Sequence, residues 1–260
     1  MRVLITGATG GIGEALIQVF ASEGYEIIAV GRNREKLEEL EKRFPKRVVG
    51  YSVDLESSDE IDRFFESVDN LDINILINGA GVGEIGYFED ISYSDLKSML
   101  DTNVLALTKF TKYFYDKMVK KGEGHIINIS STAGFQQGGA LMSAYYATKA
   151  YVNSLTLSIY EEGREKGVKV TLLAPGPTKT NFKGMDKKLT SFEKLYVTTA
   201  EEVAKELWSG LKREKLIVIP GRVNRILYFI DKFIPLKLKL KLVKMVQMKK
   251  RKNIFVLVKK

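Results

Sequence analysis

A tyrosine and a lysine four residues apart, Tyr145 and Lys149, are the pair in this chain best suited to acid–base chemistry. On a helix, side chains four residues apart lie on the same face, and a nearby positive charge favours the ionised form of a tyrosine. An isolated tyrosine has a pKa of about 10, too high for efficient proton transfer at neutral pH. The neighbouring Tyr146 has Ala150 at the matching position and lacks such a partner. We therefore predict that Tyr145 gives or takes a proton and that Lys149 lowers its pKa.

A glycine-rich turn, TGATGGIG at residues 6–13, joins the first predicted strand to the first predicted helix. Glycines let the backbone approach a pyrophosphate closely, and the free N–H groups at a helix N-terminus bind anions. An ordinary strand-to-helix turn is the alternative, but the position between a strand and a helix favours a dinucleotide. The expected cofactor contacts in this turn are Gly7, Thr9, Gly10, Gly11, Ile12 and Gly13.

Short apolar runs alternate with longer segments of helical periodicity along most of the chain. The predicted strands cover residues 2–6, 26–30, 47–53, 74–78, 125–130, 168–173 and 215–219. The predicted helices cover residues 11–23, 34–44, 58–68, 94–120, 145–162 and 200–211. Strands that are apolar almost throughout are typical of a sheet covered on both faces. The pattern predicts a Rossmann-like α/β fold, a doubly wound parallel sheet of about seven strands with helices on both faces.

The composition disfavours several kinds of site. The chain has no cysteine and a single histidine, His125, so disulfides, thiolate chemistry and multi-histidine metal sites are excluded, and we expect no metal. A Ser-His-Asp triad is disfavoured because His125 precedes the apolar run IINIS, where a residue at the start of a strand is the simpler interpretation. We find no signal peptide pattern and no apolar run near the roughly 18–20 residues that span a bilayer, and therefore expect a cytoplasmic protein.

Four motifs resemble, in the same order, those of the short-chain dehydrogenase/reductase family. They are T-G-x-x-x-G-x-G from residue 6, NGAG at residues 78–81, SSTAG at 130–134 followed by Y-x-x-x-K, and PGPTKT at 175–180. The resemblance covers roughly residues 1–220. One departure is Gly79, which stands where the family usually has a second asparagine; it puts local hydrogen bonding in doubt and leaves the chemistry intact.

The resemblance implies a role for each polar residue near the catalytic pair. Ser131 is expected to hydrogen-bond the substrate oxygen, and the alternative, Ser130, is interpreted as a structural residue at the strand end. Asn103 matches the family's helix asparagine, which holds a water in a proton relay to the lysine. Tyr145 and Lys149 are also expected to contact the cofactor, Lys149 through the nicotinamide ribose. Further cofactor contacts implied by the matching motifs are Asp54, Leu55, Asn78, Ala80, Pro175, Gly176, Thr178 and Thr180.

The end of the second predicted strand indicates which nicotinamide cofactor is used. NAD-specific members of such folds carry an acidic residue there to bind the ribose 2′-hydroxyl. This chain has Gly31 at that position and Arg32 after it. A guanidinium pairs with a phosphate through two hydrogen bonds, whereas an acid would repel it. We therefore predict NADP(H), with Arg34 as a second candidate cation or simply the start of the next helix.

Residues 221–260 form a basic extension to a predicted catalytic domain at residues 1–220. Residues 220–260 contain 13 Lys and Arg and one acidic residue, a net charge of +12, whereas residues 1–219 carry −3. The pattern predicts two amphipathic helices hinged at Pro235, then a basic run at 249–252 and a short apolar end. These helices cover the substrate cleft or a dimer interface, or they lie on an anionic membrane. Nucleic acid is disfavoured as a partner because apolar residues dominate the lysine-bearing faces.

Together these features predict an NADP(H)-dependent oxidoreductase that reduces a hydrophobic ketone or aldehyde, of acyl, lipid or steroid type, to an alcohol. The loop 138–142 and the segment 181–196 are expected to shape the pocket, the latter through Phe182, Met185, Leu189, Phe192 and Leu195. The alternative is a non-catalytic NADP(H)-binding sensor or membrane-associated scaffold, which needs no proton donor. We expect a homodimer or homotetramer, with peripheral contact at the inner face of the membrane left open.

Overall fold

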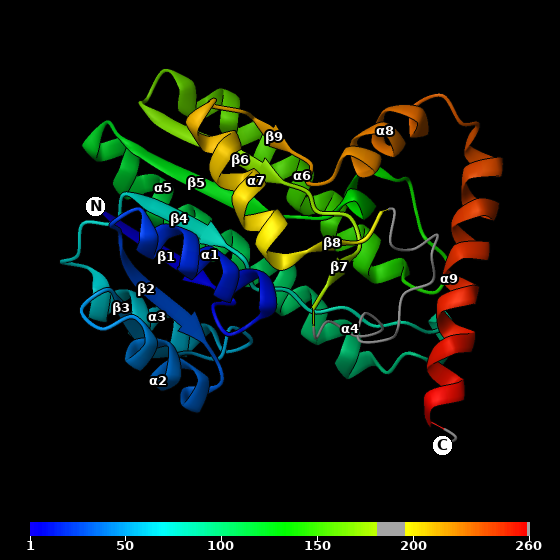
Figure 1. Ribbon diagram of the computed structural model, residues 1–260, viewed down its shortest axis with the longest axis horizontal. Coiled ribbons are helices and arrows are strands. Elements are labelled where there is room, and N and C mark those ends of the chain that lie inside the picture. The colour runs from blue at the N-terminus through cyan, green and yellow to red at the C-terminus, as the bar shows by residue number, and fades with distance from the viewer. Residues whose placement is uncertain (181–195, 259–260) are drawn as a thin grey trace.

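The structure, a computed structural model, describes residues 1–180 and 196–258, with side chains up to residue 248. A sheet of seven parallel strands runs through it in the order β3-β2-β1-β4-β5-β6-β9, as predicted (Figure 1). The strands are β1 (Arg2–Thr6), β2 (Glu26–Gly31), β3 (Val48–Ser52), β4 (Ile75–Asn78), β5 (Gly124–Ile129), β6 (Val168–Leu173) and β9 (Ile217–Val218). The order reverses between β1 and β4, and in such sheets ligands bind at the carboxyl ends beside this reversal.

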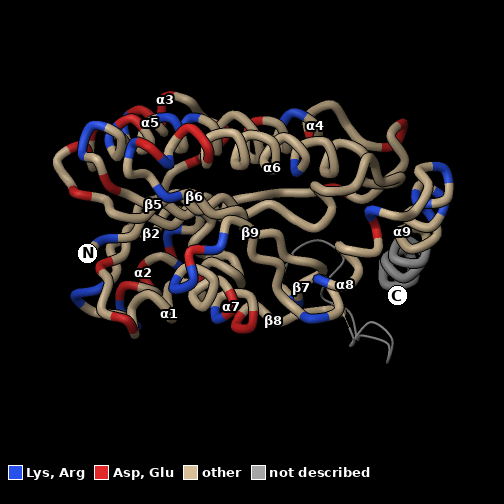
Figure 2. Tube along the Cα trace, turned by 90° about the horizontal axis from the view of Figure 1, so that it is seen from above, with Lys and Arg blue, Asp and Glu red and all other residues tan. Residues whose placement is uncertain are grey.

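Helices cover both faces of the sheet, and each layer has its own apolar core (Figure 2). One layer consists of α1 (Gly11–Ser22), α2 (Arg34–Arg43) and α7 (Ala200–Lys212). The other contains α3 (Ser58–Val68), α5 (Leu107–Lys121) and α6 (Ser143–Arg164). The predicted elements of this part of the chain are confirmed, with ends that differ by at most two residues. The one exception is the long helix that was predicted at residues 94–120.

That segment is helical throughout, but a π-helical stretch that was not predicted interrupts its α-helical bonding. It consists of α4 (Tyr93–Leu100), a π-helical stretch η2 (Asp101–Ala106) and α5. Asn103 lies within η2 and is fully buried, with its amide hydrogen-bonded to the backbone of Val82 in both directions. Such π-helical insertions occur frequently at functional sites. The sequence carries no glycine or proline here that would indicate the change, so the prediction gave the helix but missed its π-helical stretch.

Local capping explains why two helices start where they do. Ser57 accepts a hydrogen bond from the backbone N–H of Glu60 at the start of α3. Thr199 and Glu202 form a reciprocal capping box at the start of α7, in which each side chain accepts the backbone N–H of the other residue. In α3 the Glu60 carboxylate does not complete such a box and accepts the N–H of Asp54. This bond holds the loop after β3 against α3.

The extension forms two helices, α8 (Arg222–Asp231) and α9 (Leu236–Val258), with Pro235 between them, as predicted. The prediction that the helix ends before the basic run at 249–252 was wrong, because α9 continues to Val258. No glycine or proline interrupts residues 236–258, so nothing in the backbone ends the helix earlier. In Figure 1, α9 (red) crosses the side of the molecule where the strands end. Within the described residues no helix is long and apolar enough to cross a bilayer.

Short elements that the sequence did not indicate complete the fold. A second sheet pairs β7 (Thr178–Lys179) with β8 (Thr198–Thr199) in parallel. Two 3₁₀ turns, η1 (Phe88–Asp90) and η3 (Thr132–Phe135), follow β4 and β5. Each of these elements lies after the carboxyl end of a long strand, and η3 and β7 place residues beside the site described next.

Candidate active site

The turn between β1 and α1 leaves backbone N–H groups available at a helix N-terminus. Gly10 is the N-cap residue of α1 and makes no side-chain capping bond. Gly7 has a φ of +69°, which favours glycine, and a Cβ atom on Gly13 would lie 2.2 Å from the Gly7 carbonyl oxygen. The turn is therefore tight, and it closes only with glycine at both positions. Its free N–H groups and the positive end of the helix dipole suit a pyrophosphate.

The loop after β6 lies directly against this turn. A Cβ atom on Gly11 would lie 3.0 Å from the Thr180 side chain, so the end of the PGPTKT segment contacts the start of α1. Thr178 and Thr180 line the same cavity as Ile12. Segments that are about 170 residues apart in sequence thus meet at one point. This is where the sequence analysis placed the cofactor phosphates.

Asn78 at the end of β4 fastens the strands to the helix layer. Its buried amide donates to the hydroxyl of Thr111 at 3.0 Å and to the amide oxygen of Asn128 at 2.9 Å. Its side chain is therefore committed to the interior, which suits a scaffold role better than the direct cofactor contact expected. Beyond it, the N–H groups of Gly79 and Ala80 donate to the hydroxyl of Thr6.

Gly79, the departure from the family pattern, fits a narrow gap. A Cβ atom there would lie 2.7 Å from the carbonyl oxygen of Thr6, so any larger residue would need the two strand ends to separate. Gly79 and Gly81 both line the cavity. The backbone of the NGAG segment, rather than its asparagine side chain, therefore faces the site.

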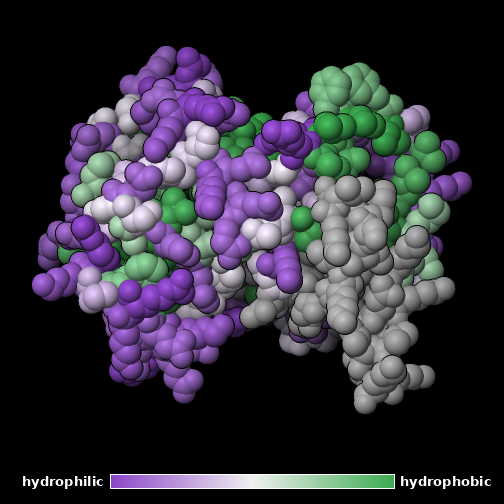
Figure 3. All heavy atoms as spheres, in the orientation of Figure 1, coloured by the Kyte–Doolittle hydropathy of each residue, from purple (hydrophilic) through white to green (hydrophobic). Residues whose placement is uncertain are grey.

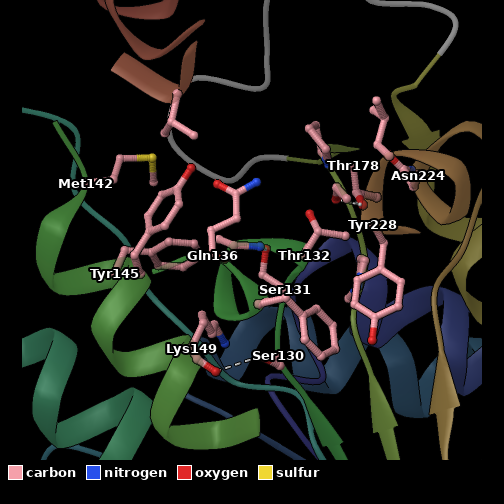
Figure 4. A pocket seen from close by; sticks show the side chains of 18 of the residues that line it. Ser130, Ser131, Thr132, Gln136, Met142, Tyr145, Lys149, Thr178, Asn224 and Tyr228 are labelled. Carbon is pink, nitrogen blue, oxygen red and sulfur yellow. Dashed lines mark hydrogen bonds between the residues drawn. The ribbon is translucent and has the colours of Figure 1, made fainter. Parts of the chain in front are cut away.

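Tyr145 and Lys149 lie one turn apart on α6, as their spacing predicted (Figure 4). The Lys149 ammonium nitrogen is 5.8 Å from the centre of the Tyr145 ring and donates to the carbonyl oxygen of Ile129 at 3.1 Å. Both residues line the cavity. The carbonyl at the end of β5 thus holds the ammonium group beneath the tyrosine ring.

Burial dominates the titration of this pair. It raises the pKa of Tyr145 to about 12, with a hydrogen bond from Ser131 acting in the opposite direction. Burial also lowers the pKa of Lys149 to about 8. The loss of solvation therefore sets the direction of the Tyr145 pKa in this structure, and the role of Lys149 in lowering it stays a prediction. At neutral pH Tyr145 keeps its proton.

The two serines of the SSTAG motif have different surroundings. Ser130 is buried and donates to the main-chain carbonyl of Lys149 at 3.0 Å, which is a structural contact (Figure 4). Ser131 caps η3 by accepting the N–H of Ala133 and shares a hydrogen bond with Tyr145. Because Ser131 and Tyr145 both line the cavity, they form the pair that can reach one substrate oxygen.

Asn103 lies next to Lys149, and its side-chain amide is hydrogen-bonded to other residues of the chain. Its amide oxygen accepts the N–H of Val82 at 2.9 Å, and its amide nitrogen donates to the Val82 carbonyl and to the hydroxyl of Thr148. A Cβ atom on Gly81 would lie 3.3 Å from both Asn103 Oδ1 and Lys149 Nζ, so these two atoms border the same small space. The asparagine thereby fixes the loop after β4 beside the lysine.

Arg32 extends from the end of β2 towards solvent. Its side chain is 62% exposed and forms a 3.3 Å ion pair with Glu56. A Cβ atom on Gly31 would lie 3.0 Å from the hydroxyl of Thr9, which leaves little room for a larger residue. Arg34 instead pairs with Glu38 along its own helix. Arg32 is therefore the cation better placed beside the phosphate turn.

The loop after β3 carries Asp54 and Leu55, two of the expected cofactor contacts. Asp54 accepts the N–H of Glu56 at 3.1 Å, and Leu55 is buried in the core beneath it. His125, by contrast, lies at the opposite end of its strand, where its ring nitrogen bonds Thr171 and burial lowers its pKa to about 4. It stays neutral at physiological pH and has no part in the site.

Comparison with known proteins identifies the chain at this point. The family described as short chain dehydrogenase matches residues 1–190. The chain belongs to this family. This dehydrogenase is 33% identical over 236 residues to the NADP-dependent 3-hydroxy acid dehydrogenase YdfG of Salmonella typhi, covering 86% of the chain and 92% of YdfG. It is therefore an oxidoreductase with the fold and the ordered motifs of that family.

Solved structures of related proteins share the fold. A short-chain dehydrogenase from Sphingobium yanoikuyae in complex with NADPH superposes with a TM-score of 0.77 at 28% identity, covering 84% of this chain and 87% of that one. A bulky-bulky ketone specific alcohol dehydrogenase from Comamonas testosteroni superposes with a TM-score of 0.75 at 26% identity, covering 89% and 90%. This dehydrogenase thus resembles family members over most of its length.

A cavity of about 540 Å³ lies between Tyr145, Ser131 and Lys149 on one side and the extension on the other. Met142 of the loop 138–142 lines it, as expected from the sequence (Figure 4). Tyr196 lines it as well, but the other residues named for the segment 181–196 (Phe182, Met185, Leu189, Phe192 and Leu195) lie outside the described residues. The walls are mainly apolar.

The extension contributes lining residues that the sequence did not single out. From α8 come Asn224, Leu227, Tyr228, Ile230 and Asp231, and from α9 come Lys239, Leu242, Val243, Val246 and Gln247. Gln247 donates to the hydroxyl of Tyr146 at 3.1 Å, which ties α9 to the catalytic helix. This geometry supports one of the roles considered for residues 221–260, the cover over the cleft, for the inner side of the two helices.

Asn224 is the contact that holds α8 in place. It is buried, its amide donates to the carbonyls of Tyr196 and Pro220, and a Cβ atom on Gly176 would lie 2.5 Å from its amide oxygen. Asn224 of α8 can therefore pack against the P-G turn only because residue 176 is glycine, which has no Cβ atom. No sequence signal links these residues, since the contact spans almost 50 positions.

Proposed function

We propose that this dehydrogenase uses NADP(H) to reduce a hydrophobic ketone or aldehyde to an alcohol, with Tyr145 as the proton donor. The observation that carries the proposal is that Tyr145, protonated at neutral pH, shares a hydrogen bond with Ser131 at the wall of an apolar cavity. Two hydroxyls that converge on one point suit a carbonyl oxygen on which negative charge develops. A protein that only senses NADP(H) would need neither group.

NADP(H) fits the residues at the other end of the cavity. The N–H groups at the start of α1 suit the pyrophosphate, and Arg32 with Gly31 before it suits a 2′-phosphate. YdfG is NADP-dependent, and the Sphingobium structure holds NADPH, which supports the same choice. When bound, the cofactor supplies the hydride that reduces the carbonyl carbon.

The chain's own groups then move the proton. Tyr145 donates its proton to the substrate oxygen, and Ser131 holds that oxygen in place. Lys149, held by the Ile129 carbonyl, stabilises the phenolate that forms, because its positive charge lies below the ring. Asn103 acts as a positioning residue, since it fixes the loop at Val82 beside the lysine.

The pH dependence of reduction should follow Lys149. Burial lowers its pKa to about 8, so the cation is lost as the pH rises through that value, whereas Tyr145, with a pKa near 12, keeps its proton. We expect kcat for reduction to fall above about pH 8. A kcat profile between about pH 6 and about pH 10 checks this. Lys149→Arg should move the fall to higher pH, and a flat wild-type profile would contradict the role.

The substrate class follows from the cavity. Its volume of about 540 Å³ lies within the range of small-molecule sites, and its lining is mostly apolar. Apolar burial contributes about 0.8 kcal/mol per methylene, or about 4-fold in affinity. We therefore expect kcat/KM to rise about 4-fold for each methylene added to a linear ketone until the cavity is filled.

Steady-state kinetics over a series of ketones with NADPH tests this expectation. Val243→Phe narrows the cavity at α9 and should move the optimum to shorter ketones, because Val243 belongs to the same apolar cluster as Tyr145 and Met142. The matched change Val49→Phe on β3, outside the cavity, should leave the optimum in place. A preference for short, charged oxo acids, the class that the name of YdfG suggests, would contradict the proposal.

We further propose that residues 1–220 act as the catalytic domain and that residues 221–260 act as its cover.

We also propose that the protein forms a homodimer or homotetramer. Exposed apolar side chains on α4 and η2 support an interface there, namely Tyr93, Leu100 and Leu105. Multi-angle light scattering of the purified chain measures the state directly.

A further inference from the structure

The outer surface of α8 is apolar, which is the reverse of an ordinary surface helix. Ile226, Phe229 and Ile230 on α8 and Phe233 in the turn after it have the spacing i, i+3, i+4, i+7 and are 47–74% exposed. The rings of Phe229 and Phe233 contact each other at 5.4 Å. A helix of a globular protein normally turns this stripe towards the core. Here the apolar stripe faces outwards.

The inward side of α8 is held by polar contacts instead. Asn224 is buried over the P-G turn, and Arg225 forms a 2.6 Å ion pair with Glu206 on α7. Asp231 pairs with Lys239 of α9 at 2.8 Å, and both side chains are largely buried. These polar contacts anchor α8 beside the apolar residues Tyr228 and Leu227 that line the cavity, so the exposed stripe does not result from loose packing.

The described part of α9 repeats this arrangement. Its deeply buried residues are polar, Lys239 and Gln247, and they bond Gln137 and Tyr146. Its exposed apolar residues are Leu236, Leu238, Leu240, Leu242, Met245 and Val246. Leu238, Leu242, Met245 and Val246 lie on one side of α9 by helical spacing, whereas Leu240 contacts the loop at Gly138. These four residues and the stripe of α8 are here called the α8–α9 face. Figure 3 shows hydrophobic atoms gathered over α8 and the adjoining part of α9.

The charges around the α8–α9 face are of one sign. Asp231 is the only acidic residue between positions 222 and 248, and Lys239 pairs with it. The other cations, apart from Arg225, are Arg222, Lys232, Lys237, Lys241 and Lys244. In a symmetric dimer formed through this face, these cations would meet their own copies, and like charges across an interface are unfavourable. An apolar surface bordered by cations matches a bilayer with anionic headgroups.

The cavity reaches the same face. Leu227, Ile230, Leu242 and Val246 line the cavity and are at the same time 39–51% exposed on the surface. The apolar wall therefore continues from the interior, between α8 and α9, to the α8–α9 face. A molecule that enters between the two helices would pass from the apolar α8–α9 face directly into the apolar cavity.

We propose that the α8–α9 face docks on the surface of an anionic bilayer, with α8 and α9 lying in the headgroup region. A second part rests on the proposed function: the carbonyl substrate passes from the bilayer into the cavity between these helices. Docking needs only the face itself, so it holds or fails independently of catalysis.

Vesicle sedimentation tests the docking. The full chain is mixed with vesicles of phosphatidylcholine alone or with a third of phosphatidylglycerol, and the bound fraction is measured against lipid concentration. We expect binding to the anionic vesicles and much weaker binding to the neutral ones. Each lysine near an anionic surface contributes about 5-fold to affinity, so Lys237→Gln with Lys241→Gln should weaken binding about 25-fold.

Two variants separate the face from general hydrophobicity. Phe229→Ser with Phe233→Ser removes the centre of the stripe outside the cavity lining, and binding should be lost. Phe88→Ser is the matched control, since Phe88 is 64% exposed on η1 and belongs to neither α8, α9 nor the cavity lining. It should bind as the wild type does.

Two results would overturn the docking. One is wild-type chain that stays in solution with anionic vesicles at low salt. The other is a wild-type dimer that the change at Phe229 and Phe233 dissociates, because a second copy would then be the occupant of the face.

The route of the substrate has its own readout. For a long-chain ketone dissolved in anionic vesicles, the change at Phe229 and Phe233 should lower kcat/KM at least 10-fold. For a short water-soluble ketone it should leave kcat/KM unchanged. If the change at Phe229 and Phe233 altered kcat/KM by the same factor for both ketones, the route would be contradicted and the docking result would stand. If the wild type reduced no carbonyl at all, only the proposed function would be contradicted.

Discussion

Replacing Tyr145 by phenylalanine should lower kcat for carbonyl reduction by about 10³-fold, in the range that a positioned proton donor contributes. The reason is that the phenylalanine ring fills the same space but has no proton to give to the oxygen that accumulates charge. Affinity for NADPH should change little, because the cavity wall keeps its shape. Steady-state reduction of a hydrophobic ketone, with NADPH binding followed by fluorescence, measures both quantities.

The neighbouring tyrosine is the matched control. Tyr146→Phe removes a hydroxyl that accepts a hydrogen bond from Gln247, and Tyr146 lines the same cavity. A single hydrogen bond contributes about 1 kcal/mol, so this change should cost roughly 5-fold or less. If Tyr146→Phe lost as much activity as Tyr145→Phe, the assignment of the proton donor to Tyr145 would be wrong.

Replacing Arg32 by alanine should lower the ratio of kcat/KM for NADPH to that for NADH by about 10- to 100-fold, the value of a charge-assisted hydrogen bond to phosphate. The effect should appear in KM for NADPH, because the 2′-phosphate lies far from the reacting carbon. Glu56, freed from its 3.3 Å ion pair with Arg32, would add repulsion of the phosphate.

Arg34→Ala serves as the control for cofactor choice. Arg34 carries the same charge two residues later, but it pairs with Glu38 on the solvent side of α2. Its removal should leave the cofactor ratio within about 2-fold, since exposed ion pairs contribute little. A ratio that is unchanged in Arg32→Ala would contradict the choice of cofactor cation.

Much of the fold could be predicted because its signals are local. Apolar runs such as residues 168–173 identify strands that are buried on both faces, and Gly7 and Gly13 mark a turn that only glycine can close. The spacing of Tyr145 and Lys149 sets both on one face of α6. What spacing could not give is the balance of their pKa values, which depends on burial by the rest of the molecule.

The features that were missed depend on contacts between distant residues. Within the π-helical stretch, the Asn103 side chain is hydrogen-bonded to the backbone of Val82, 21 positions away. No residue of the stretch is one that breaks a helix locally, so the sequence gives no sign of it. Gln247 reaches Tyr146 across 101 positions. An amphipathic pattern shows that α8 and α9 have two faces, but it does not say which face is inside. The structure buries the polar residues Asn224, Lys239 and Gln247 and leaves many of the apolar residues of both helices exposed.

Single-turnover oxidation of enzyme-bound NADPH tests the central claim most directly. A stoichiometric complex of the chain with NADPH is mixed with a hydrophobic ketone, and the absorbance of the reduced nicotinamide is followed. The claim predicts complete oxidation by the wild type with one equivalent of alcohol formed, and about 10³-fold slower oxidation by Tyr145→Phe. Tight NADPH binding without oxidation by any ketone or aldehyde would contradict it and identify the chain as a binding protein.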